Sequence, residues 1–191
     1  KRISFFYRIL EERIFVIDHQ PSSFVDDFQQ INKETQDEVR KKFKLPSNYL
    51  FYPAMYLPHK NHLTLIKALN ILQKESNIKN LNLVCCGNDI GYLQILKKFT
   101  TQKGLDKNVI FLDFVKDEYL PYLYIDSSIL VMPSLIGPTN IPPWEAFKMK
   151  RPVIYSALPG IKPVLGNAVC YVDPMEPNEI ANGIKKILED K

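Results

Sequence analysis

The sequence predicts an α/β protein with a Rossmann-like parallel sheet and helices on both faces. From residue 48 onward, short apolar runs typical of buried strands alternate with longer runs whose apolar residues recur three and four positions apart. This order implies βαβ crossovers, which make neighbouring strands parallel and cover both faces of the sheet. The chain has 191 residues, 46% of them hydrophobic and 24% charged, which is typical of one globular domain with a full core.

The first 47 residues lack this alternation. Residues 3–17 mix aromatic and charged side chains and end in the β-like run Ile-Phe-Val-Ile. Residues 22–44 carry scattered apolar residues among many charges, as one or two amphipathic helices do. We therefore expect residues 1–47 to be an arm or linker and residues 48–191 to form the regular domain. Because the chain starts at Lys1 without an initiator methionine, we also expect it to be a fragment.

The regular part divides into six predicted strands and five predicted helices. The strands are expected at residues 49–52, 81–86, 109–112, 129–132, 153–155 and 168–172. The helices are expected at residues 62–75, 92–103, 118–125, 143–149 and 177–189.

Several function classes are disfavoured by what the sequence lacks. It has no G-x-G-x-x-G motif after the first strand and no P-loop, so a dinucleotide enzyme or an ordinary NTPase is not indicated. The net charge of +4 is mild and the lysines are scattered, which argues against nucleic acid as a partner. Adjacent Cys85 and Cys86 lie in an apolar run and are expected to be buried thiols. His59 and His62 are expected at the surface, and no metal site is predicted.

Candidate binding residues follow three of the predicted strands. Lys60 precedes a helix after the first strand, with Asn61 as its expected N-cap, and Gly87 follows the second strand. A loop after the fourth strand leads to two prolines and to Glu145, in a first helical turn whose free N–H groups would attract an anion. Each feature alone has a simpler explanation: a solvated lysine, a tight turn and an acid favoured by the helix dipole. Because the carboxyl ends of parallel strands share one edge, together they predict a site for a phosphorylated ligand.

Several ordered motifs also carry a family resemblance. V-M-P-S-L, I-P-P-W-E-A, R-P-V-I and V-L-G-N-A-V-C-Y-V-D-P follow one another between residues 131 and 174, after H-K-N-H at 59–62 and D-E-Y-L-P-Y-L-Y at 117–124. Over residues 48–190 the chain resembles the carboxyl-terminal domain of GT-B fold retaining glycosyltransferases of family 4. The expected fold is therefore one half of a GT-B fold.

The resemblance implies a donor domain that binds a nucleotide diphosphate sugar for transfer to an acceptor, in surface polysaccharide or glycoconjugate synthesis. The acceptor, a sugar or a glycolipid, would be held by a missing amino-terminal domain, without which the fragment would be inactive. The resemblance further implies a cytoplasmic protein that touches a membrane only through the missing domain and needs no cofactor or metal. It assigns a phosphate-binding role to Lys60 and a ribose-binding role to Glu145 as the catalytic residues. The donor-binding residues that it implies are Gly87, Gly137, Thr139, Asn140 and Ile141.

Three departures from the family pattern keep alternatives open. Gly137 stands where members usually have the first of two glutamates, near the transferred sugar. The arginine common after the first strand is absent near Met55, and Lys150-Arg151 replaces a usual glycine. One alternative is a non-catalytic nucleotide-sugar-binding module that has lost its chemistry. Another is a GT-B epimerase that acts on nucleotide sugars.

Overall fold

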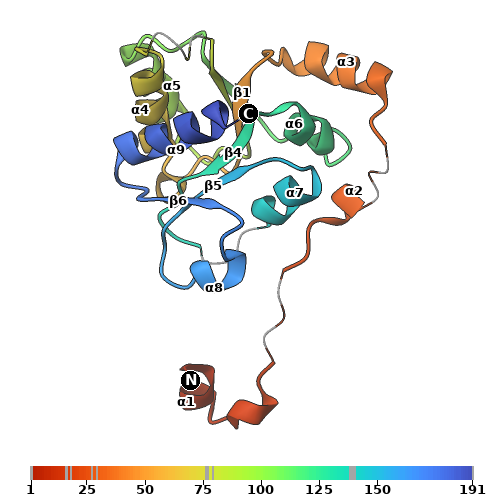
Figure 1. The fold of residues 1–191 in the computed structure, drawn as a ribbon, viewed down its shortest axis with the longest axis vertical. Helices are drawn as coiled ribbons and strands as arrows, with labels where there is room; N and C mark the ends of the chain where they lie inside the picture. Colours follow the sequence, from red (N-terminus) through yellow and green to blue (C-terminus); the bar gives the residue numbers. More distant parts are fainter. Residues whose placement is uncertain are drawn as a thin grey trace.

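The structure is a computed structural model that describes residues 2–15, 17, 19–26, 28, 30–75, 78, 80–137 and 141–190. Its centre is a six-stranded, all-parallel sheet with the strand order β3-β2-β1-β4-β5-β6 (Figure 1). This confirms the predicted Rossmann-like α/β fold. The strands are β1 (Tyr49–Pro53), β2 (Asn82–Cys86), β3 (Val109–Leu112), β4 (Ile129–Met132), β5 (Val153–Ser156) and β6 (Cys170–Val172).

Helices cover both faces of the sheet, as predicted. On one face, α4 (His62–Leu72) packs against α5 (Leu93–Gln102) and α9 (Pro177–Glu189). On the other face, α6 (Leu120–Asp126) packs on β1 and α7 (Pro142–Lys148) packs on β5 (Figure 1). Because the central strands are covered on both sides, every residue from Tyr49 to Tyr52 is 0% exposed.

All eleven predicted strands and helices of the regular part are present, with ends that differ by a few residues. The short helix α8 (Lys162–Leu165) was not predicted, nor was α1 (Arg2–Tyr7). The β-like interpretation of residues 14–17 is wrong for the residues that the structure describes there, because none of them lies in a strand. Phe15 and Ile17 are 82% and 89% exposed, so neither side chain packs on the sheet.

The two cysteines of β2 are buried, as predicted. Burial raises the pKa of the Cys86 thiol to about 12, and the pKa of Cys85 is also raised by burial. Both thiols are therefore protonated and unreactive, and they pack as small apolar groups.

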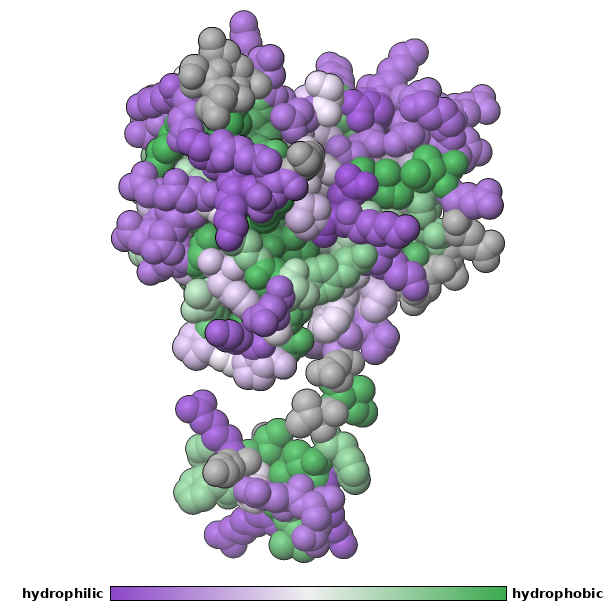
Figure 2. Space-filling model, viewed as in Figure 1, coloured by the Kyte–Doolittle hydropathy of each residue, from purple (hydrophilic) through white to green (hydrophobic). Residues whose placement is uncertain are grey.

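The predicted arm consists of two different parts. Residues 2–15 extend away from the sheet and carry exposed apolar side chains, among them Phe5 and Phe6, which are 78% and 73% exposed (Figure 2). By contrast, Val25 of α2 (Ser23–Asp26) and Val39 of α3 (Lys33–Phe43) belong to the hydrophobic core. Part of the segment before residue 48 therefore packs on the domain, and the domain boundary at residue 47 stays a prediction.

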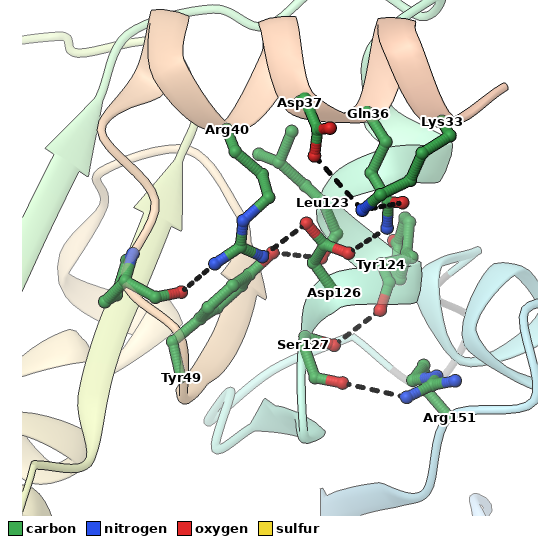
Figure 3. A network of polar contacts seen from close by, with 11 residues as sticks. Lys33, Gln36, Asp37, Arg40, Tyr49, Leu123, Tyr124, Asp126, Ser127 and Arg151 are labelled. Atoms are coloured by element: carbon green, nitrogen blue, oxygen red, sulfur yellow. Dashed lines mark hydrogen bonds and ion pairs between the residues drawn. The ribbon is translucent and has the colours of Figure 1, made fainter. Parts of the chain in front are cut away.

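A polar clasp holds α3 on the domain (Figure 3). Asp126, at the end of α6, accepts hydrogen bonds from Arg40 Nη1 at 2.6 Å and from Gln36 Nε2 at 2.5 Å. Arg40 also donates to the Pro46 carbonyl at 3.1 Å. The Asp126 side chain is only 6% exposed, so its charge depends on these donors.

No helix in the described ranges combines the length and the apolar composition that a bilayer span requires.

Candidate functional site

The order of the strands creates a topological switch between β1 and β4. From β1 the chain moves outward through β2 to β3, and it then returns past β1 to β4 and moves outward the other way. Ligands of open α/β sheets bind in the crevice at such a point, beyond the carboxyl ends of the strands. Lys60 follows β1, Gly87 follows β2 and Gly137 follows β4, so the predicted residues do share this edge.

The loops after β1 and β4 are joined directly. The Leu135 amide donates to the His59 carbonyl at 2.8 Å, and the Tyr52 hydroxyl donates to the Lys60 carbonyl at 2.8 Å. The turn that carries Lys60 therefore lies against the loop that leads to Gly137. Thr139 and Asn140, which were predicted to bind the donor, lie outside the described residues.

Lys60 is half-buried at the end of a short 3-10 helix (Pro58–Lys60). Burial lowers the pKa of its ammonium group, because partial removal from water disfavours the charged form. Among the described residues, none forms an ion pair with Lys60. A half-buried cation without an acidic partner is suited to bind an anion from solution.

The prediction that His62 lies at the surface is wrong, because this side chain is 0% exposed. Its ring packs on Tyr52 and Tyr56, with centroids 4.7 and 5.4 Å away. Neither imidazole nitrogen finds a hydrogen-bond partner in the described part of the chain. Burial, assisted by the positive charge of Lys60, lowers the pKa of His62 to about 3. The ring is therefore neutral and adds no cation to the site.

The start of α7 differs from the predicted anion site. Pro142 and Pro143 have no N–H, and the amides of Trp144 and Glu145 both donate to the Ile141 carbonyl. From Pro142 to Glu145, the first turn of α7 therefore offers no free amide. The sequence argument for an anion site there is wrong. The α4 helix keeps two such groups. Its Thr64 and Leu65 amides donate to the Asn61 carbonyl, but its His62 and Leu63 amides have no acceptor in the helix and follow Lys60 closely in the chain.

Glu145 is buried, with only 6% of the residue exposed. Its carboxylate oxygens accept one hydrogen bond each, from the Ser22 hydroxyl and from the Tyr124 hydroxyl, both at 2.5 Å. Burial and the neighbouring carboxylate raise the pKa of Tyr124 well above its ordinary value, so this phenol acts as a donor. Glu145 is therefore more than a helix-dipole partner. Its carboxylate is held in place by two hydroxyls from separate segments.

Ser22 and Tyr124 were not identified from the sequence as neighbours of Glu145. The Tyr124 ring packs in the core on Phe51, with centroids 5.0 Å apart. Its hydroxyl gives it the second role. No local pattern marks Ser22, which lies 123 positions before Glu145 and meets it only through the fold.

Gly87 permits a close approach of the chain to itself. A Cβ atom added to Gly87 would lie 2.4 Å from the Ala54 carbonyl oxygen and 2.8 Å from the Met55 nitrogen. The loops after β1 and β2 are packed too tightly there for any side chain. This contact gives Gly87 a structural role, and its predicted role in donor binding stays a prediction.

Gly87→Ala should therefore destabilise the domain by roughly 1 to 3 kcal/mol, because the two loops have to move apart. Urea denaturation measures this loss, and Asn88→Ala is the matched control because the Asn88 side chain is exposed and its backbone contacts remain. Equal stability of the two variants would show that these loops separate without cost.

A hollow of about 250 Å³ opens at the same edge, beyond β1 and β2. Phe114, in the turn after β3, lies at its wall and is 65% exposed. The other lining residues include Met55, Cys86, Gly87, Val115 and Asp117.

Gly137 has a φ of 116°, which disfavours any other residue at this position. Its carbonyl accepts a hydrogen bond from the Tyr155 hydroxyl at 3.1 Å. A glycine at this position therefore has a conformational reason. Among the described residues, no group of three or more histidine, cysteine or acidic side chains is placed to hold a metal ion.

Comparison with known proteins gives both sequence and structural relatives. The family model for glycosyl transferases group 1 matches residues 33–191. The O-antigen chain mannosyltransferase RfbU of Salmonella typhimurium is 32% identical over 181 residues, which are 95% of this chain and 46% of the relative. The O-antigen chain mannosyltransferase B of Escherichia coli is 28% identical over 153 residues, 80% of this chain and 40% of the relative. The chain thus spans less than half the length of these relatives.

Solved structures agree with the fold. A glycosyltransferase from Rickettsia africae superposes with a TM-score of 0.84 at 21% identity, over 98% of this chain and 50% of that one. Anabaena HepE, solved in complex with UDP-glucose, superposes with a TM-score of 0.74 at 21% identity, over 91% and 46% of the two chains. The family match covers both the sheet and α3, and the chain belongs to the glycosyl transferases group 1 family.

Proposed function

We propose that this chain is the donor-binding part of a glycosyltransferase, which binds a nucleotide diphosphate sugar at the carboxyl edge of β1 and β4. The observation that carries the proposal is Lys60, a half-buried cation without an acidic partner among the described residues, next to the first turn of α4. The HepE structures contain UDP and UDP-glucose, which supports a nucleotide-sugar ligand. The names of the relatives support sugar transfer in O-antigen synthesis.

Within this proposal, each residue has a distinct task. When the bond between the sugar and the diphosphate breaks, negative charge grows on the leaving diphosphate. Lys60 and the free amides at the start of α4 stabilise that charge more in the transition state than in the ground state. Glu145 accepts hydrogen bonds from the two ribose hydroxyls, and the hollow beside Phe114 takes the base. The acceptor, a sugar or a glycolipid, binds outside this chain, in the cytoplasm or at a membrane surface.

Lys60→Ala should weaken the binding of a nucleoside diphosphate about tenfold or more, because a charged hydrogen bond contributes roughly 1.5 to 3 kcal/mol. The unphosphorylated nucleoside should bind as before. Calorimetry with UDP and uridine, and with GDP and guanosine, measures both effects. Lys67→Ala is the matched control, since Lys67 is an exposed lysine of α4.

The possible results separate the competing explanations. Unchanged diphosphate binding by Lys60→Ala would mean that Lys60 is only a surface cation. If neither diphosphate binds the wild-type chain, the donor-site proposal fails. The next candidate is a non-catalytic binding module, because Gly137 departs from the pattern that the family resemblance implies. Tight donor binding without sugar transfer, in a protein that also contains the acceptor-binding domain, would favour that candidate.

A further inference from the structure

Asn61 has an unusual conformation in the turn between β1 and α4. Its φ and ψ are 59° and 34°, in the left-handed region that few residues other than glycine, asparagine and aspartate adopt. It stands at the N-cap of α4, as expected, but its side chain makes no capping hydrogen bond to the helix backbone. Only 8% of the residue is exposed. The side chain must therefore have another task.

The Asn61 amide connects three segments of the sheet edge. Its Nδ2 group donates to the Pro133 carbonyl at 3.0 Å and to the Pro174 carbonyl at 2.7 Å. Its Oδ1 atom accepts from the Thr64 hydroxyl at 2.6 Å. Pro133 directly follows β4 and Pro174 follows β6, so one side chain ties the Lys60 turn to the ends of two other strands.

A second set of contacts fixes the same turn from the sheet side. The Tyr52 hydroxyl donates to the Lys60 carbonyl and lies 3.0 Å from the buried Ser134 hydroxyl. The Leu135 amide donates to the His59 carbonyl. Together with Asn61, these bonds join the residues on both sides of Lys60 to the loop that precedes Gly137.

We propose that Asn61 is a positioning residue for the diphosphate subsite. It holds the Lys60 turn and the first residues of the loop after β4 in one arrangement, so that the Lys60 ammonium group and the first turn of α4 are in place before the anion arrives. Fixing these groups before the ligand arrives lowers the entropic cost of binding. This inference rests on the proposed function, and it adds a residue that makes no contact with the ligand itself.

The direct test is Asn61→Gly, because glycine keeps the positive φ without strain and removes only the side-chain bonds. Asn80→Gly is the matched control: Asn80 has a φ of 70° and is exposed. We expect Asn61→Gly to weaken UDP or GDP binding about tenfold, as expected for the loss of roughly one to two hydrogen bonds, and to leave uridine or guanosine binding unchanged. Asn80→Gly should change neither affinity.

A purely structural role would give a different result. In that case Asn61→Gly would lower the melting temperature and weaken nucleoside and diphosphate equally, or it would bind both like wild type, and either result overturns the proposal. If Asn61→Gly does not fold, Ser134→Ala removes one bond of the same network and should lower the preference for diphosphate in the same direction. If Lys60→Ala loses the diphosphate preference while Asn61→Gly and Ser134→Ala keep it, the proposed function stands and the role of Asn61 fails.

Discussion

Glu145→Gln should weaken the binding of a nucleoside diphosphate at least about tenfold, since each hydrogen bond to a charged carboxylate contributes roughly 1.5 to 3 kcal/mol. The two carboxylate oxygens already accept from Ser22 and Tyr124. Because each oxygen has two lone pairs, both can still accept from a ribose hydroxyl. A glutamine replaces one of these acceptors with a donor, which then faces a hydroxyl that is already donating.

Calorimetry with UDP or GDP and with their 2′,3′-dideoxy analogues measures this effect. The loss should shrink for the analogues, which have no diol for Glu145 to hold. The buried contacts of Glu145 with Ser22 and Tyr124 also stabilise the folded chain, so the variant should melt earlier than wild type.

Glu179→Gln is the matched control, because Glu179 lies in the first turn of α9 and accepts a hydrogen bond from the Asp173 amide at the surface. It reports what a first-turn glutamate contributes through the helix dipole, about 0.3 to 1 kcal/mol of stability. If Glu145→Gln melts earlier but binds the diphosphate and its dideoxy analogue like wild type, Glu145 is structural and the ribose role is lost.

Asp126→Ala should lower the free energy of unfolding by roughly 3 kcal/mol. That is the low end of the range for removing one partner of a buried ion pair, chosen because the Arg40 side chain is 29% exposed. The variant leaves Gln36 without its acceptor and Arg40 with only the Pro46 carbonyl. Urea denaturation followed by circular dichroism measures the loss, and proteolysis should cut first near α3.

Glu75→Ala provides a control at an ion pair with the same distance and greater exposure. Glu75 pairs with Lys185 at 2.6 Å, the same distance as in the Arg40–Asp126 pair, but its side chain is 31% exposed against 6% for Asp126. An exposed pair contributes less than about 1 kcal/mol, so Glu75→Ala should cost little. Equal losses in the two variants would mean that burial does not strengthen the clasp on α3.

The strands and helices from residue 48 onward could be predicted because their apolar spacing is a local property. The covered parallel strands are almost wholly apolar, and the helices between them show one apolar face each. The run at residues 14–17 has the composition of a strand. Its described residues pair with no strand in the described part of the chain, and sequence alone does not show whether a partner strand exists. The burial of His62 was also missed, because the sequence does not show that the start of α4 packs on Tyr52 and Tyr56.

The site could be predicted only as a set of residues at one edge. Lys60, Gly87 and Gly137 share that edge because parallel strands end together, which follows from topology. The free amides expected at the start of α7 were an avoidable error, since Pro142 and Pro143 lack N–H groups whatever the fold. The contacts of Asn61 with Pro133 and Pro174 were beyond sequence reasoning, because they depend on how three loops meet.

The clasp on α3 affects where the protein should be cut for expression. A fragment that starts at Asn48 would keep Asp126 but lose both of its donors, and it would uncover the Tyr119 ring that Phe43 now covers at 5.7 Å between centroids. Such a fragment would carry a desolvated charge beside a newly exposed apolar surface, which favours aggregation. A fragment that starts before Asn32, which caps α3 by accepting from the Thr35 amide, keeps the helix, its cap and the clasp together.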